Sequence, residues 1–144
     1  MAHEKILFHL TQDEDGYPPA DSEGVWADAT DRGTYIVDNI PFYTTQATNG
    51  DEIVAVLIDG ILTYESTLRK SGNSLLRIVF FNDTDPSSIR RELLTIGCES
   101  EGSHLKSLIS VNVPAHVPLM QVVQKLTPGV SAGLWDYEEA ILRQ

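Results

Sequence analysis

The N-terminal half of the sequence alternates short apolar or β-branched segments with turn residues. Five segments are predicted to form strands, at residues 5–11, 24–29, 34–38, 51–58 and 61–68. Glycine, proline and asparagine lie between them and end regular ladder pairing. Asp59-Gly60, between the last two segments, is the strongest two-residue hairpin signal in the chain. The pattern predicts a small curled β-sheet or barrel.

The C-terminal half has a different rhythm, because helical spacing alternates with strand-like runs. Asp85-Pro86 is typical of an N-cap followed by proline at the first helical position, and Gly97 fits a C-cap. A second helix is predicted from Pro118, and Thr127-Pro128-Gly129 is expected to stop it. Strands are predicted at residues 75–81, 98–102, 105–113 and 133–142. The last segment would also suit a helix, and we favour a strand because it completes a β-α-β-β-α-β pattern.

These elements predict an α+β protein with two subdomains. Residues 1–70 form the small curled β-sheet or barrel, and residues 75–144 form a ferredoxin-like βαββαβ unit. The polar segment 69–74 is the boundary between them. A four-stranded sheet with two helices on one face needs cover on the other, so we expect the subdomains to pack as one compact protein.

Charge narrows the choice of partners. The 144 residues carry a net charge of −11, which repels phosphate backbones and attracts basic proteins. Residues 1–31 hold eight acids against a single base, Lys5, whereas residues 69–91 are mildly basic. We therefore expect a basic protein partner and no nucleic acid, and a homo-oligomer is left open.

A reducing compartment is indicated by the single cysteine, Cys98, which has no second thiol for an internal disulfide. The N-terminus lacks a signal-peptide pattern, and the longest apolar run, residues 53–58, is too short to span a bilayer. The expected location is the cytoplasm, without membrane attachment.

Two clusters of acids are candidates for partner binding. Asp13, Glu14 and Asp15 lie in a predicted loop. Trp135, Asp136 and Glu138 lie in the last predicted strand, where an aromatic ring beside carboxylates is typical of a protein interface. Trp135 could instead fill the seam between the subdomains. The loop from Asp13 lacks the acids that a calcium loop requires at its fifth and twelfth positions, so no metal is predicted.

A cleft between the subdomains is the alternative site, for a small molecule or a reaction. Its candidate residues are Tyr17, Trp26, Phe42, Glu99, Glu101 and His104. Carboxylates and an imidazole can do acid–base work, but the spacing matches no standard catalytic or zinc motif. Phosphate loops, nucleophile elbows and CxxC pairs are absent, and acids beside Cys98 would raise its pKa, so a non-enzyme without a cofactor is favoured.

Four segments resemble those of a bacterial family of unknown function, and together they span most of the chain: Gln12–Pro19, Val37–Phe42, Gly97–His104 and Trp135–Ala140. The resemblance implies a bacterial source and supplies no catalytic residues. The function expected from charge and size is an acidic protein-binding module, such as an immunity or antitoxin-type inhibitor of a basic partner. The alternative is a small-molecule-binding protein or enzyme that uses the cleft between the subdomains.

Overall fold

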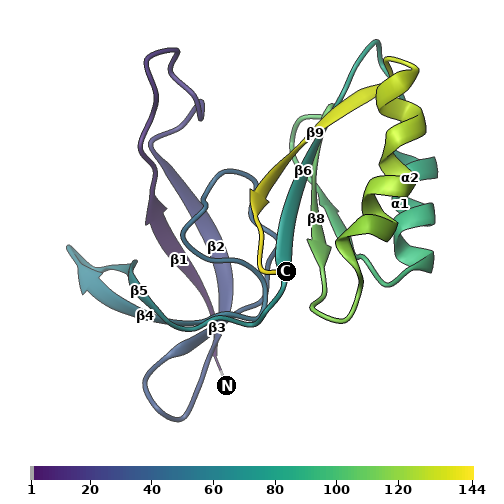
Figure 1. Cartoon of the computed structure of the whole chain (residues 1–144). Coiled ribbons are helices and arrows are strands. Elements are labelled where there is room, and N and C mark those ends of the chain that lie inside the picture. Colours follow the sequence, from purple (N-terminus) through teal and green to yellow (C-terminus); the bar gives the residue numbers. More distant parts are fainter. Residues whose placement is uncertain (1) are drawn as a thin grey trace. The chain divides into compact units, whose positions relative to one another are not determined.

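A computed structural model describes residues 2–144, and the chain divides into two compact units, Met1–Ser71 (unit 1) and Gly72–Gln144 (unit 2). Unit 1 contains β1 (His3–His9), β2 (Ser22–Ala29), β3 (Tyr35–Val37), β4 (Glu52–Ile58) and β5 (Ile61–Arg69). Unit 2 contains β6 (Ser74–Phe80), α1 (Ser87–Thr95), β7 (Ser100–Gly102), β8 (Leu108–Val113), α2 (Leu119–Ser131) and β9 (Trp135–Ile141) (Figure 1). The mixed α+β class is confirmed. That the units pack as one compact protein stays a prediction.

Unit 1 is a closed barrel in which the strands pair in chain order, so the predicted barrel is confirmed. Neighbouring strands are antiparallel, and β1 closes the barrel through a parallel contact with β5 at Leu7 and Thr63. Side chains alternate along each strand, so every second residue points inward. The buried interior is made by Ile6, Phe8, Val25, Ala27, Val37, Ala47 and Ile53.

The β4–β5 connection confirms the hairpin that the sequence predicts. Asp59 has φ 52° and Gly60 has φ 81°, so both central residues are left-handed. A type I′ turn requires this geometry, and Asp-Gly adopts it at low cost. The turn places Ile58 opposite Ile61 and so sets the register at the end of the hairpin.

Unit 2 is a four-stranded antiparallel sheet in the order β7-β8-β6-β9, with both helices on one face (Figure 1). Its core lies between helices and sheet, and alternate residues of β6 and β8 supply one side of it. The buried side chains include Leu76, Ile78, Phe80, Ile109, Val111 and Val113 from the sheet and Ile89, Leu93, Val122 and Leu126 from the helices. The strand predicted at residues 133–142 is confirmed as β9.

Both ends of α1 show why the helix was predictable. Asp85 Oδ1 accepts the Ser87 N–H at 2.9 Å. The N-cap residue is Pro86, one residue after Asp85, which was the predicted N-cap. At the other end Gly97 has φ 94°, and its N–H donates to Leu94. The N–H of Cys98 reaches back to the carbonyl of Leu93, which completes a Schellman motif.

The predicted end of the second helix is wrong, because α2 runs through Pro128 to Ser131. Proline lacks one N–H but keeps its carbonyl, which accepts the N–H of Ala132 at 3.0 Å. Gly129 is buried in the last turn, where it lies against the indole of Trp135. Packing of this last turn therefore allows the helix to continue past Pro128-Gly129, although a proline followed by glycine usually ends a helix. No helix of residues 2–144 is long and apolar enough to cross a membrane.

Candidate functional site

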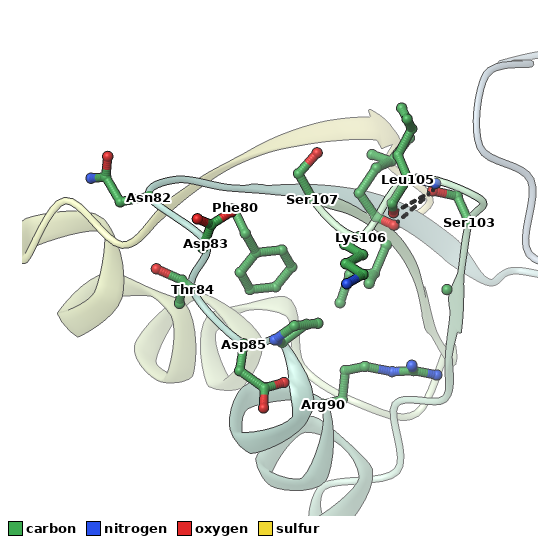
Figure 2. A pocket seen from close by; sticks show the side chains of 14 residues that line it. Phe80, Asn82, Asp83, Thr84, Asp85, Arg90, Ser103, Leu105, Lys106 and Ser107 are labelled. Carbon is green, nitrogen blue, oxygen red and sulfur yellow. Dashed lines mark hydrogen bonds between the residues drawn. The ribbon is translucent and has the colours of Figure 1, made fainter.

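Unit 2 contains a pocket of about 730 Å³ beside the C-terminal end of β6 (Figure 2). Its walls are the loop 82–86, the first turn of α1 and the loop 103–107. Phe80, Leu105 and Leu108 give it an apolar lining. Ligand pockets are commonly of this size and combine such a lining with a few charged groups.

The first wall is held by a tight turn. The N–H of Thr84 donates to the carbonyl of Phe81 at 3.0 Å, and Asn82 and Asp83 between them have φ 53° and 58°. Asparagine and aspartate are the side chains that best tolerate this left-handed conformation. The turn therefore fixes the position of the loop before helix α1 begins.

The second wall is held by Ser103. Its hydroxyl accepts the N–H of Leu105 and donates to the carbonyl of Leu108, both at 3.0 Å. The N–H of Phe80 donates to the carbonyl of Ser107 at 2.8 Å, which ties this loop to β6. Both walls are thus fixed by hydrogen bonds within unit 2, and the pocket is preformed.

Two cations face the pocket. Arg90 donates from Nε to Ser100 Oγ at 2.9 Å and from Nη2 to the Ser100 carbonyl at 3.1 Å, so its guanidinium is held in place. A Cβ on Gly102 would lie 3.5 Å from Arg90 Nη1, which is ordinary van der Waals contact, so the backbone of β7 runs beside this nitrogen. Figure 2 shows Lys106 and Arg90 around the same space as the ring of Phe80.

Two acids also line the pocket, Asp83 and Asp85, both from the loop before α1. Asp85 Oδ1 accepts both the N–H and the hydroxyl of Ser87, and these bonds lower the pKa of its carboxyl. Asp85 therefore stays ionised and is engaged with the start of α1. None of the pocket side chains was predicted, because they come from separate segments that no spacing rule connects.

The acidic segment of unit 1 is the loop between β1 and β2. Asp13, Glu14 and Asp15 are exposed there, as predicted. Asp13 Oδ1 accepts the N–H groups of Asp15 and Tyr17, each at 2.9 Å, so Asp13 shapes the loop and the next two acids are presented to solvent. That these acids bind a partner stays a prediction.

Trp26 lies on the outer face of the same β1–β2 hairpin and is 42% exposed. The ring of His3 stacks on it with centroids 4.8 Å apart, and Lys5 Nζ lies 5.7 Å from its centroid. His3 Nδ1 is 2.6 Å from Asp28 Oδ1, and with Asp38 the three offer ligand atoms within 4.8 Å of one another. Sequence inspection missed this group because it depends on the β1–β2 register.

Tyr17 and Phe42 lie in loops of unit 1. Tyr17 is 47% exposed and meets Tyr43 edge-to-face, with ring centroids 6.3 Å apart. The carboxylate of Glu23 accepts three successive backbone N–H groups, those of Phe42, Tyr43 and Thr44, at 2.7 to 3.1 Å. Glu23 therefore fixes the loop that carries Phe42. The cleft predicted for Tyr17, Trp26 and Phe42 stays a prediction.

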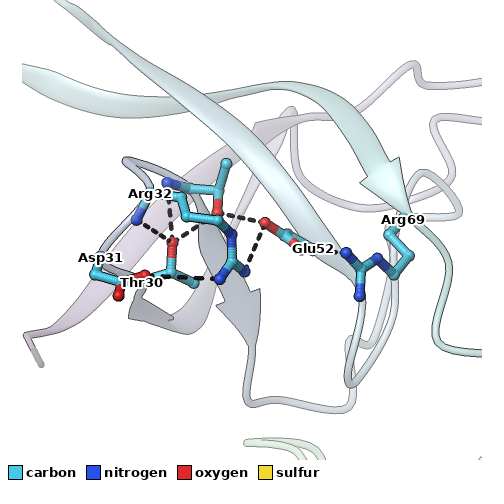
Figure 3. A network of polar contacts seen from close by, with 6 residues as sticks. Thr30, Asp31, Arg32, Glu52 and Arg69 are labelled. Atoms are coloured by element: carbon cyan, nitrogen blue, oxygen red, sulfur yellow. Dashed lines mark hydrogen bonds and ion pairs between the residues drawn. The ribbon is translucent and has the colours of Figure 1, made fainter.

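A buried carboxylate, Glu52, stabilises the barrel (Figure 3). It is 3% exposed, accepts the Thr34 hydroxyl at 2.6 Å and the Arg32 guanidinium at 3.0 Å, and lies 3.8 Å from Arg69 Nη2. The hydrogen bond from Thr34, followed by that from Arg32, lowers the pKa of Glu52. The network joins the turn before β3 to β4 and β5, which is a structural role.

Trp135 is half-buried inside unit 2. Its indole N–H donates to the carbonyl of Leu126 at 3.1 Å, and its ring meets Phe80 edge-to-face at 5.8 Å. This packing gives Trp135 a structural role within unit 2, and its part in partner binding stays a prediction. Asp136 is exposed, and Glu138, 51% exposed, forms an ion pair at 3.2 Å with buried Arg77.

Unit 2 places the predicted acid–base residues at and around β7, and their chemical role stays a prediction. Glu99 precedes β7 and lines a second hollow of about 510 Å³, Glu101 lies opposite Ser110 in the β7–β8 ladder, and His104 is exposed on the following turn. In the described part of the chain these three do not form a metal-binding group. Cys98 is buried in the core, and burial raises the pKa of its thiol to about 11. The pKa of Cys98 is therefore raised, as predicted, but the cause is burial and not the neighbouring acids.

A family model described as "Domain of unknown function (DUF4265)" matches residues 23–137. The predicted resemblance to a family of unknown function is thereby confirmed. A solved structure, "Novel crystal structure of a hypothetical protein from Neisseria gonorrhoeae", is similar with a TM-score of 0.81 and 19% identity, covering 100% of this chain and 99% of that one. This likeness concerns the fold. No curated protein matches.

Proposed function

We propose that this chain, which belongs to the DUF4265 family of unknown function, is a cytoplasmic binding protein for a basic partner protein. The observation that carries the proposal is the concentration of negative charge in unit 1. Residues 1–71 hold thirteen acids and four bases, a net charge of −9, whereas unit 2 has eight acids and six bases, a net charge of −2. A field of one sign speeds encounter with a partner of the opposite sign.

The β1–β2 hairpin is the proposed contact surface. Glu14 and Asp15 are exposed in its connecting loop, and Trp26 is exposed on its outer face next to Asp28. Tryptophan is enriched among the residues that dominate binding energy, and surrounding acids would select a basic partner. Inhibition of a basic toxin, as by an immunity protein or antitoxin, is the specific form of this function that we propose.

The proposal is tested by affinity capture from a lysate of the source organism at about 0.1 M and about 1 M salt, between which the screening length falls from about 10 Å to about 3 Å. One basic protein, released by salt and identified by mass spectrometry, is expected. A Glu14→Lys variant should weaken capture, whereas Glu65→Lys, the same charge reversal on β5, should leave it unchanged. If the amount of captured partner changes neither with salt nor with the loop charges, the proposal is refuted.

The role of the β9 acids in partner binding is tested with a separate variant. Asp136→Asn removes a charge from the predicted β9 surface without disturbing the ion pair of Glu138 with Arg77. Loss of capture in Asp136→Asn alone would move the contact surface from unit 1 to unit 2. For the toxin form, co-expression with the captured partner should restore growth that the partner alone prevents.

A small-molecule-binding protein or enzyme is the second candidate. It is favoured by the preformed pocket of unit 2, which has an apolar lining and two cations, Arg90 and Lys106. The predicted cleft between the units, with Glu99, Glu101 and His104, stays a prediction.

We also infer that unit 2 is a ferredoxin-like unit. The succession β6, α1, β7, β8, α2, β9 and the sheet order β7-β8-β6-β9 support this assignment.

A further inference from the structure

We propose that the pocket of unit 2 binds a small organic monocarboxylate, with the carboxylate on Arg90 and Lys106 and an apolar body on Phe80. This proposal concerns unit 2 and does not rest on the partner proposed above. Its basis is the geometry of the lining side chains, which combines two cationic donors with an aromatic floor in one preformed hollow (Figure 2).

Arg90 supplies the directed part of the site. Two of its nitrogens are already bonded to Ser100, so the guanidinium loses little freedom when a ligand binds. Nη1 takes no part in the two hydrogen bonds to Ser100 and lies beside Gly102. One N–H direction from Arg90 and the ammonium of Lys106 provide a donor for each oxygen of a carboxylate.

The ligand is expected to have an apolar body because the ring of Phe80 is held in place at the pocket. Its ring meets Trp135 edge-to-face at 5.8 Å, and its backbone N–H is bonded to Ser107. Phe80 is 5% exposed and lines the pocket. Leu105, 44% exposed, adds apolar surface from the opposite loop, so a ligand would cover both.

The acids of the pocket limit the charge that the ligand can carry. Asp83 and Asp85 line the same pocket from the loop before α1, and the whole chain has a net charge of −11. Asp83 and Asp85 offset the charges of Arg90 and Lys106, so the lining has no net positive charge. A phosphate dianion would therefore be repelled more strongly than a carboxylate, which brings a single negative charge. A simple cation is disfavoured because Asp85 is already engaged with Ser87.

The direct test is titration calorimetry of the full chain at about 0.1 M salt with phenylacetate and its neutral analogue phenylacetamide. Acetate, which lacks the apolar body, and inorganic phosphate complete the set. Loss of a charged hydrogen bond costs about tenfold in affinity or more, so phenylacetate should bind at least tenfold more tightly than phenylacetamide. Acetate and phosphate should be weaker than phenylacetate. Equal binding of phenylacetate and phenylacetamide, or tighter binding of phosphate, would overturn the proposal.

Matched variants locate the site. Lys106→Gln should weaken phenylacetate about tenfold, and Lys70→Gln, the same change in unit 1, should leave it unchanged. Gly102→Ala would place a methyl group against Arg90 Nη1 and should also weaken binding. Asp83→Asn should strengthen it, because it removes a repelling charge and asparagine tolerates the same left-handed conformation. Lys106 is exposed, so its substitution tests the site even if Gly102→Ala fails to fold. Identical affinities for Lys106→Gln and Lys70→Gln, or weaker binding by Asp83→Asn, would overturn the assignment.

Discussion

Replacing Gly129 by alanine should destabilise unit 2, although helix propensity alone predicts the opposite. Gly129 is buried in the last turn of α2, and a Cβ there would overlap the atoms Cζ2, Cε2 and Cη2 of Trp135. The indole cannot move freely, because its N–H is bonded to the carbonyl of Leu126 and its edge packs on Phe80.

The magnitude follows from three contributions. Alanine instead of glycine inside a helix gains about 0.5–1 kcal/mol. Overpacking a core costs about 1–3 kcal/mol, and loss of the indole hydrogen bond to Leu126 costs about 1 kcal/mol. The expected net effect is a destabilisation of about 1–3 kcal/mol.

Urea denaturation followed by circular dichroism at about 222 nm is the suitable assay, because both helices of residues 2–144 lie in unit 2 and dominate that signal. Ser131→Ala, at the exposed end of the same helix, is the control and should change stability by less than about 0.5 kcal/mol. Trp135→Phe removes the overlapping atoms, so the double variant should be less destabilised than the sum of the single ones. A Gly129→Ala protein as stable as the wild type would refute the reasoning.

Three further predictions concern other groups. The pKa of Glu52 is lowered from its ordinary value of 4.5, so its contribution to stability is present above that value and is lost as the pH falls through the folded pKa. The thermal midpoint of unit 1, measured by calorimetry, should therefore drop in acid. Glu52→Gln should make that midpoint less dependent on pH. Cys98, buried and with a pKa of about 11, should react with a thiol reagent at about pH 8 only after unfolding, and rapid labelling of the folded chain would contradict its burial. Gly60→Ala, at φ 81°, should cost unit 1 about 1 kcal/mol or more, measured by calorimetry, whereas Gly60→Asn should cost less.

The parts of the fold that were predictable are those set by neighbouring residues. Asp59-Gly60 specifies its turn through backbone conformation alone, and Asp85-Pro86 and Gly97 mark the ends of α1 through hydrogen bonds that span a few residues. Strand segments were predictable for the same reason, since alternation is a property of the segment itself.

The end of α2 is wrongly predicted because a residue distant in the sequence determines the packing there. Gly129 was interpreted as a helix stop, yet glycine is needed there because the indole of Trp135 on β9 occupies the space of a side chain. The contact of Trp135 with α2 depends in turn on the register of β9 on β6, and the sequence does not specify that register. Local composition cannot specify either contact.

The pocket of unit 2 could not be predicted from the sequence for a related reason. Glu99, Glu101 and His104 are close along the chain, but one precedes β7, one lies in the ladder and one occupies the turn. Phe80 and Arg90 are ten residues apart and Lys106 is further still, yet they line one hollow, because β6 ends where α1 begins and the β7–β8 loop returns beside it. Only the sheet order brings them together.

The uneven charge of the two units gives the two proposals a different dependence on salt. A basic partner attracted by the net charge of −9 on unit 1 should bind more weakly as salt increases, because long-range attraction is screened first. A monocarboxylate must approach a chain of net charge −11 before it meets Arg90 and Lys106, so salt screens a repulsion as well as the local attraction. Its affinity should therefore change little over the range in which the partner dissociates. A carboxylate affinity that falls with salt as steeply as the partner's would mean that the pocket cations act through long-range charge, and the directed contact inferred for Arg90 would be wrong.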